Sequence, residues 1–211
     1  MEWGNLSWNN EQAQTEEKEP EAKKTKRRKS VAYQNTTKHL YRRAFSESQL
    51  FDAVGIELKR GYSYNVMTAG DVDALSYLKL ILRHQDLDYC LFSTWVMAAE
   101  DILIFEDWLK SGKIKKLDAY LGEVFPGSYA VEYQMLKRVF RENKCGRIAV
   151  FRNHSKIFAG YGKKFHFGIQ TSANINTNPR AENGCITIDK GIFEFYKSYF
   201  DDIECIDRNS E

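Results

Sequence analysis

Several features that would assign the chain to a special class are scarce or missing. Its 211 residues include only three prolines, too few for an extended or low-complexity chain. The four cysteines form no C-x-x-C pair, so neither a zinc site nor a disulfide framework is indicated, and we expect no metal and no other cofactor. No stretch approaches the ~20 apolar residues that span a bilayer, and the N-terminus lacks an apolar signal core. We therefore expect a reduced, cytoplasmic protein with no membrane partner.

The charges nearly balance overall but are unevenly distributed. The net charge is +2, yet residues 11–21 hold five glutamates and residues 23–29 hold six cations. Residues 1–30 have little hydrophobic periodicity, so they cannot bury enough apolar surface to offset the entropy of ordering. We predict a disordered tail over 1–30 and one globular domain over 31–211. The basic cluster of the tail fits nucleic acid phosphates, and a solubilising role is the alternative.

From residue 44 onward, apolar runs of strand length alternate with stretches of helical period. The first part of this region predicts strands over 62–68, 89–95, 116–120 and 147–151. It also predicts helices over 46–54, 98–110 and 128–142, and one more helix that begins at an N-cap on Asp71. The last part predicts short strands over 155–159, 165–170 and 185–188 and a helix over 191–200. This alternation indicates an α/β fold, a mixed and mostly parallel sheet sandwiched by helices. The sequence contains no internal repeat.

Five polar residues stand where predicted strands begin or end. His154 and Lys156 follow one strand, and their spacing puts both side chains on the same face of an extended chain. Ser172 and Asn174 follow the next strand with the same spacing, and Glu182 precedes the last strand. We expect these residues at loop ends of one sheet.

These residue types fit phosphodiester chemistry without a metal. A neutral imidazole can attack phosphorus, and the transition state then needs positive charge and hydrogen-bond donors around its equatorial oxygens. An ammonium and a carboxamide supply both, and a carboxylate near the imidazole fixes its tautomer. The spacing alone is a weak signal, because His-x-Lys pairs are common in sequences.

The order of these residues resembles the motif of the phospholipase D superfamily, in which H-x-K is followed by a small-Ser-x-Asn element and a downstream acidic residue. Here H-x-K is His154-Ser-Lys156, and the second element is Thr171-Ser-Ala-Asn174. The stretch from Thr171 to Asn183 looks more closely like single-motif members encoded in phages and prophages, as do residues 92–95 and 114–117. The resemblance covers roughly residues 60–200 and implies a phospholipase D/nuclease-like fold.

The resemblance also implies a role for each residue. His154 would be the nucleophile that forms a phosphohistidine, Lys156 and Asn174 would bind the phosphate, Ser172 would assist, and Glu182 would orient the histidine. Family members with one motif normally pair, so that two copies of the motif surround one phosphate. The missing internal repeat therefore predicts a homodimer.

One position departs from the family pattern. The superfamily normally has an aspartate where this sequence has Tyr161, after four residues that follow the lysine. That aspartate is thought to be structural, so its absence leaves open a competent phosphodiesterase and a degenerate site that only binds phosphate.

A basic rim is expected beside the site. Lys163 and Lys164 in a predicted turn, together with Arg152 and Arg180, would suit a polyanionic substrate. A solvated turn is the other interpretation of the two lysines.

Nucleic acid is the expected substrate and partner, because no apolar rim or amphipathic helix that would meet a lipid surface stands out. The resemblance and the basic rim together predict a metal-independent nuclease that cuts DNA or RNA through a phosphohistidine in a homodimeric site. The alternative is a catalytically degenerate phospholipase D-like protein that binds DNA or acts as a phage regulatory or interaction protein. The expected location is the cytoplasm of a bacterium or of a phage-infected host.

Overall fold

The computed structural model describes residues 37–54, 57–176 and 180–206. The strands are β1 (Lys38–Ser46), β2 (Tyr62–Asp71), β3 (Leu87–Thr94), β4 (Leu117–Gly122), β5 (Ile148–Phe151), β6 (Ile157–Gly162), β7 (His166–Thr171) and β8 (Glu182–Thr187). The helices are α1 (Glu47–Val54), α2 (Ala74–His84), α3 (Ala99–Lys110), α4 (Phe125–Ser128), α5 (Ala130–Asn143) and α6 (Lys190–Asp201). The predicted tail over 1–30 and its basic cluster lie outside the described residues.

The described strands form one sheet in the order β1-β2-β8-β7-β6-β3-β4-β5. The pairs β1·β2, β3·β4 and β4·β5 are parallel, and the four pairs between β2 and β3 in this order are antiparallel. The expected mixed α/β fold is confirmed, with a smaller parallel part than the alternation of strands and helices indicated. The difference arises near the C-terminus, where β6 and β7 are joined by a hairpin and a hairpin makes its strands antiparallel.

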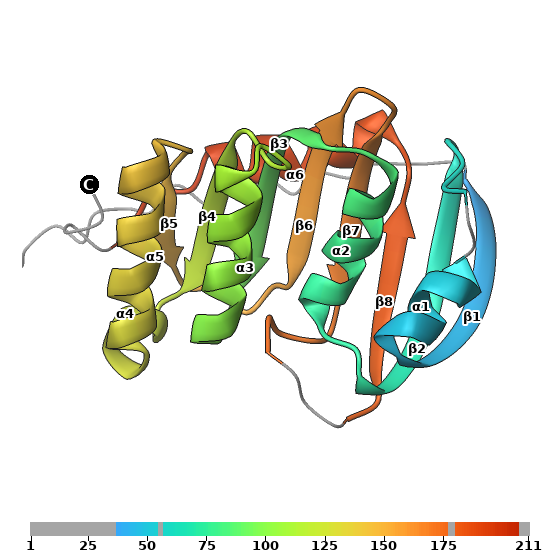
Figure 1. The fold of residues 1–211 in the computed structure, drawn as a ribbon, viewed down its shortest axis with the longest axis horizontal. Helices are drawn as coiled ribbons and strands as arrows, with labels where there is room; N and C mark the ends of the chain where they lie inside the picture. Colours follow the sequence, from blue (N-terminus) through green and yellow to red (C-terminus); the bar gives the residue numbers. More distant parts are fainter. Residues whose placement is uncertain (1–36, 55–56, 177–179, 207–211) are drawn as a thin grey trace, which may run out of the picture. The chain divides into compact units, whose positions relative to one another are not determined.

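Helices cover the two faces of the sheet unequally. In Figure 1, α1, α2, α3 and α5 lie on the near face, and α6 crosses the far face close to the upper edge of the sheet. The near layer holds most of the core, including fully buried Phe92 and Phe105. Under α6, a smaller aromatic layer contains Tyr120 and Phe200. Within the described chain, the lower part of the far face has no helix over it.

Capping side chains explain where two of the helices begin. Asp73 accepts from the Ser76 backbone N–H at 2.8 Å, which makes a capping box at the start of α2. Asp189 accepts from Ile192 N–H at 3.0 Å and caps α6 in the same way. The predicted N-cap on Asp71 is wrong by two residues, because β2 continues through Asp71.

The hydropathy pattern does not predict β1, because its basic residues resemble a continuation of the tail. In the structure, Lys38 to Ser46 pair in parallel with β2. β1 is the outermost strand of the described sheet, and charged residues are well tolerated on such an edge strand.

Candidate active site

The H-x-K residues lie in the connection between β5 and β6, at the lower edge of the sheet in Figure 1. Residues 153–156 are irregular, so the two side chains do not project from an extended strand as expected. The connection meets the carboxyl end of β3, where the parallel part of the sheet joins the antiparallel part. In open α/β sheets, ligands commonly bind outside the carboxyl ends of the strands.

Asn153 fixes this connection to the sheet. Its buried side chain donates from Nδ2 to Ser93 Oγ at 2.9 Å, to Thr94 O at 3.3 Å and to Tyr120 O at 3.1 Å. Its Oδ1 accepts from the backbone N–H of Ser155 at 2.9 Å and from the hydroxyl of Ser155 at 2.7 Å. A buried amide with this many partners is held in one orientation, so the backbone next to His154 is held in place.

His154 and Lys156 contact each other directly. Lys156 Nζ lies 2.9 Å from His154 Nδ1 and 3.5 Å from Nε2, and it donates to the His154 backbone oxygen at 2.8 Å. The imidazole packs against Trp95, with ring centres 5.1 Å apart. Gly122 on β4 makes room for Trp95, because a Cβ there would lie 2.5 Å from its ring. His154 is exposed whereas Lys156 is only 7 % exposed, so solvent reaches the imidazole and the ammonium is shielded.

Glu182 and Ser172 complete the same edge of the sheet. Burial lowers the pKa of the Lys156 ammonium, and the nearby Glu182 carboxylate opposes this shift. Ser172 Oγ donates to the Glu182 carboxylate and accepts from Asn183 N–H at 3.0 Å. The Thr171 N–H donates to Lys156 O at 3.1 Å and joins the end of β7 to the start of β6. The structure therefore brings the two predicted halves of the motif together.

Glu182 does not contact the histidine as expected. Among the described residues no hydrogen bond joins Glu182 to His154, and the carboxylate is bound by Ser172 instead. Within one chain, Glu182 therefore acts on Lys156 through its charge.

Asn174 lies in the loop that follows Ser172. Its backbone oxygen accepts from Ala74 N–H at 3.2 Å, and Ile175 O accepts from Ala98 N–H at 3.2 Å, so the loop is held by the starts of α2 and α3. The side-chain oxygen of Asn174 is buried and has no hydrogen-bond partner among the described residues. A buried acceptor without a partner is costly, so this loop is held by its backbone hydrogen bonds and not by the Asn174 oxygen.

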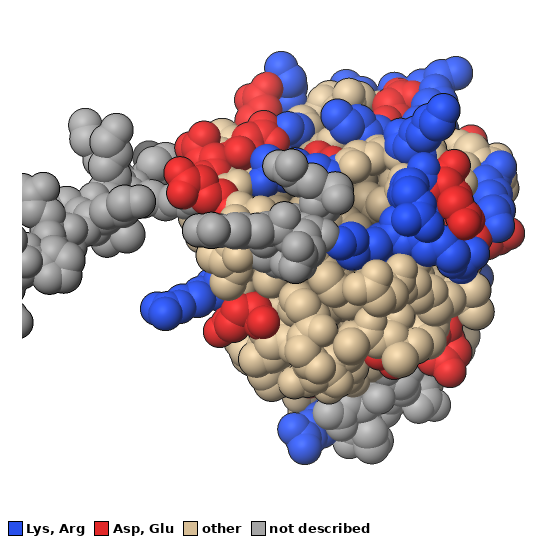
Figure 2. Space-filling model, turned by 90° about the vertical axis from the view of Figure 1, so that its left-hand side faces the viewer, with Lys and Arg blue, Asp and Glu red and all other residues tan. Residues whose placement is uncertain are grey.

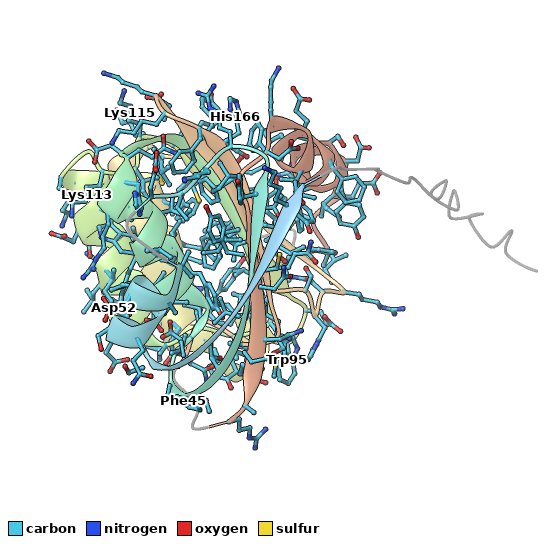
Figure 3. All side chains as sticks on the ribbon, turned by 90° about the vertical axis from the view of Figure 1, so that its right-hand side faces the viewer. Phe45, Asp52, Trp95, Lys113, Lys115 and His166 are labelled. Atoms are coloured by element: carbon cyan, nitrogen blue, oxygen red, sulfur yellow. The ribbon has the colours of Figure 1, made fainter. Side chains whose placement is uncertain are left out.

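Lys163 and Lys164 lie at the opposite end of β6 from the H-x-K residues. The length of β6 separates them from Lys156 by roughly 20 Å of extended chain. Lys164 Nζ donates to His84 O at 2.5 Å. Figure 3 shows Trp95 at the lower end of the molecule and His166, which follows this turn, at the upper end. The prediction that these lysines form a rim beside the site is therefore wrong.

The two arginines of the expected rim are close in the chain to residues of the candidate site. Arg152 directly precedes Asn153, and Arg180 lies two residues before Glu182. Both side chains are exposed. They supply positive charge at the edge where the candidate site opens.

Tyr161 takes no part in the candidate site. Its ring packs with those of His166 at 5.1 Å, Phe193 at 5.3 Å and Tyr89 at 6.1 Å, beneath α6. The position that is an aspartate in the superfamily is thus part of an aromatic cluster here.

Two residues of the site have roles that the motif does not reveal. Asn153 directly precedes the H-x-K element, and Trp95 belongs to residues 92–95, for which the resemblance implies no role. Their contacts join β3, β4 and the β5–β6 connection, so they depend on packing between strands that are distant in sequence. The one available signal was the position of Trp95 directly after a buried strand.

Neither a metal site nor a membrane-spanning helix is found in the described ranges. No group of three or more His, Cys, Asp or Glu side chains is arranged there to hold a metal ion. None of the described helices is both long and apolar enough to cross a bilayer.

Comparison with known proteins gives only distant structural likeness. Neither a family model nor a curated protein matches the chain. Polyphosphate kinase from Porphyromonas gingivalis is similar at 14 % identity and a TM-score of 0.49, over 67 % of this chain and 26 % of the kinase. Phosphatidylserine synthase from Haemophilus influenzae is similar at 12 % identity and a TM-score of 0.46, over 65 % of this chain and 37 % of the synthase. The chain thus spans well under half the length of either protein.

Proposed function

We propose that this protein is a metal-independent phosphodiesterase of the phospholipase D type that cleaves nucleic acid in a homodimeric site. The observation that carries the proposal is the direct contact of Lys156 Nζ with the exposed His154 ring, 2.9 Å from Nδ1, beside the Ser172–Glu182 pair. The imidazole is accessible for attack, and the shielded ammonium lies where negative charge would develop.

The proposed reaction has two displacement steps. In the first, a ring nitrogen of His154 bonds to phosphorus while the bond from phosphorus to the leaving oxygen breaks, and that oxygen takes a proton from the second copy's imidazolium. In the second, water gives a proton to that imidazole, and its oxygen displaces the His154 nitrogen from phosphorus. The ammonium of Lys156 and the amide of Asn174 stabilise the phosphoryl oxygens in both steps.

The homodimer is supported by what a single chain leaves incomplete. One chain supplies one imidazole, whereas the two steps use one as nucleophile and one as acid and base. The site also opens at the lower edge of the sheet, where the far face carries no described helix.

The test is cleavage of single-stranded DNA, duplex DNA and RNA with a chelator present, alongside the small substrate bis(p-nitrophenyl) phosphate. We expect His154→Ala to reduce cleavage of all cleaved substrates by at least about 10³-fold, because it removes the nucleophile. After rapid quenching under alkaline conditions, the wild-type protein should carry on residue 154 a phosphoryl group that is still esterified to the retained part of the substrate.

His166→Ala is the matched control, because His166 lies at the other end of the sheet and packs against Tyr161 and Phe193. It should retain wild-type cleavage. A wild-type protein that binds nucleic acid but cleaves none of these substrates would overturn the proposal in favour of a degenerate, binding-only site.

A further inference from the structure

A groove runs beside the outer edge of β5, away from the candidate active site. It has a volume of about 820 Å³ and lies between the last turns of α5, the start of β5 and the segment that follows α6. Its apolar surface comes from Phe140, Ile148 and Ile203. Gly146 allows the chain to pass close to β4 here, because a Cβ would lie 2.0 Å from Leu117 O. The groove is therefore built into the packing of α5, β4 and β5.

The groove carries charge of one sign. Lys137, Arg141, Lys144 and Arg147 line it, and no Asp or Glu is found among its described lining residues. Figure 2, which views the molecule from the α5 side, shows Lys and Arg side chains gathered in a band across this face. Three exposed carboxylates, Glu142, Asp202 and Glu204, are next to lining residues in the sequence, and Glu142 is paired with Arg138. A concave surface of this kind concentrates an anionic partner.

The four cations are not equally engaged by the protein. Arg147 donates to Ile203 O at 2.6 Å and stacks over Tyr120, and Lys137 lies over the ring of Tyr133. Arg141 and Lys144 are exposed, and their side chains form no ion pair among the described residues. These two cations are therefore available to a ligand while Arg147 supports the fold.

The spacing of the cations fits a chain of phosphates better than a single anion. Lys137 and Arg141 lie about one turn apart on α5, and Lys144 is its C-cap residue, so the three cations span seven residues, or about 10 Å. Successive phosphates of a duplex strand advance by about 3.4 Å along its axis, so this length matches about three of them. A site for one small anion would instead need its donors to converge on one point.

We propose that this groove binds the phosphate backbone of nucleic acid as a second contact, separate from the site of phosphodiester cleavage. The inference rests on the proposed function for the reason why the protein would bind nucleic acid. The affinity of the groove for phosphates depends only on its own cations. Arg147 and His154 lie at the two ends of β5, at most about 25 Å apart along the chain. A nucleic acid held in the groove extends past β5 by about seven base pairs to reach the exposed imidazole.

The test uses full-length protein carrying His154→Ala, so that bound nucleic acid is not cut. Binding of labelled 30-nucleotide duplex and single-stranded probes is measured by fluorescence anisotropy from 50 to 200 mM salt. We expect Arg141→Gln/Lys144→Gln to weaken binding roughly tenfold at 100 mM salt and to reduce the slope of log K against log salt by about 1.5 to 2. The charge reversal Arg141→Glu/Lys144→Glu should weaken binding further.

Lys59→Gln/Lys113→Gln is the control with the same change in net charge. Both lysines are exposed and lie outside the groove. This variant should change affinity less than threefold. Equal losses in the two double variants would show that only the overall charge matters, and no loss in the groove variant would overturn the proposal. Thermal melts of each variant exclude unfolding as the cause.

A second measurement separates this inference from the proposed function. With His154 intact, Arg141→Gln/Lys144→Gln should hydrolyse bis(p-nitrophenyl) phosphate at the wild-type rate, because that substrate is too small to reach the groove. The wild-type protein could hydrolyse none of the substrates while the Arg141→Gln/Lys144→Gln change still weakens nucleic acid binding. In that case the cleavage proposal fails and the groove proposal stands. If no nucleic acid binds at all, the groove proposal fails.

Discussion

Asp101 is a carboxyl group whose protonation is coupled to folding. It lies in the first turn of α3 and is only 8 % exposed. Burial, together with the negative charge of Asp73, raises the pKa of Asp101 to about 6. Since the folded protein binds this proton more tightly than the unfolded chain does, Asp101 favours folding below about pH 4, and this contribution is lost as the pH rises toward 6.

Replacing Asp101 with Asn should therefore stabilise the protein at neutral pH. We expect the free energy of unfolding at pH 7 to rise by on the order of 2 kcal/mol, and its decrease between pH 4 and 6 to become shallower. Urea unfolding at several pH values measures both. Asp52→Asn, an exposed position on α1, controls for the loss of one negative charge. A variant that is less stable than wild type at pH 7 would contradict this interpretation.

The residue types of the site could be predicted from sequence, but their partners could not. Polar residues that follow buried strands meet at one sheet edge, which explains why His154 and Ser172 were found. The expected contact of Glu182 with His154 failed because Ser172 binds the carboxylate. The misplacement of Lys163 has a simpler cause, because the sequence does not show that the turn lies a full strand length away from the site.

At the scale of elements, the Asn153 side chain joins three of them. It binds residues of β3 and β4 from the β5–β6 connection. Asn153→Ala should lower the free energy of unfolding by about 1–3 kcal/mol, because it removes the donor for these buried acceptors. It should also reduce kcat at temperatures where the variant is fully folded, since the connection that carries His154 is no longer anchored to β3 and β4.

Asn153→Asp is the matched variant, because the carboxylate keeps the acceptor for Ser155 but loses the donors of Nδ2. Its loss of activity should equal or exceed that of Asn153→Ala. Thermal melts and kinetic constants measured on the same samples provide the comparison. Full activity in Asn153→Asp would show that the bonds to β3 and β4 do not position the histidine.

Most elements could be predicted from periodicity, because their buried faces repeat regularly. The short helix α4 was not predicted, and neither was β1, because its basic composition hides an outermost strand of the described sheet. The start of α2 was misplaced because Asp71 and Asp73 are both acceptable N-caps, and only the length of β2 decides between them.

At the scale of the whole molecule, the far face of the sheet exposes apolar surface next to the site. Met67 on β2 is 55 % exposed and pairs with Asn183 of β8. A groove lined by Met67, Gln170 and Ser172 leads from this face to the candidate site. A second copy of the chain that covers this surface would meet Ser172 of the candidate site.

Met67→Glu should therefore convert a dimer into a monomer and abolish cleavage. Light scattering after size exclusion would then give a mass near 24.6 kDa in place of twice that value. Leu103→Glu is the control, because Leu103 is 51 % exposed on α3, which lies on the other face of the sheet. A monomeric but active wild-type protein would contradict the dimeric site.

The strand order of the sheet was beyond the reach of the sequence. Local patterns identify strands but not their neighbours, and here β2 pairs with β8 while β6 pairs with β3. The homodimer was expected from the single motif alone and stays a prediction.

The pairing of β2 with β8 has a consequence for how the site is made. Ser63 and Thr187 are bonded through their hydroxyls although they are 124 residues apart in the chain. Closing such a long loop is slow compared with forming local contacts. During synthesis, the sheet cannot close until β8 has left the ribosome, so Glu182 joins His154 and Lys156 among the last steps of folding. A chain released before that point would hold the histidine without the carboxylate, and the open edges of β2 and β7 would be free to pair with other chains.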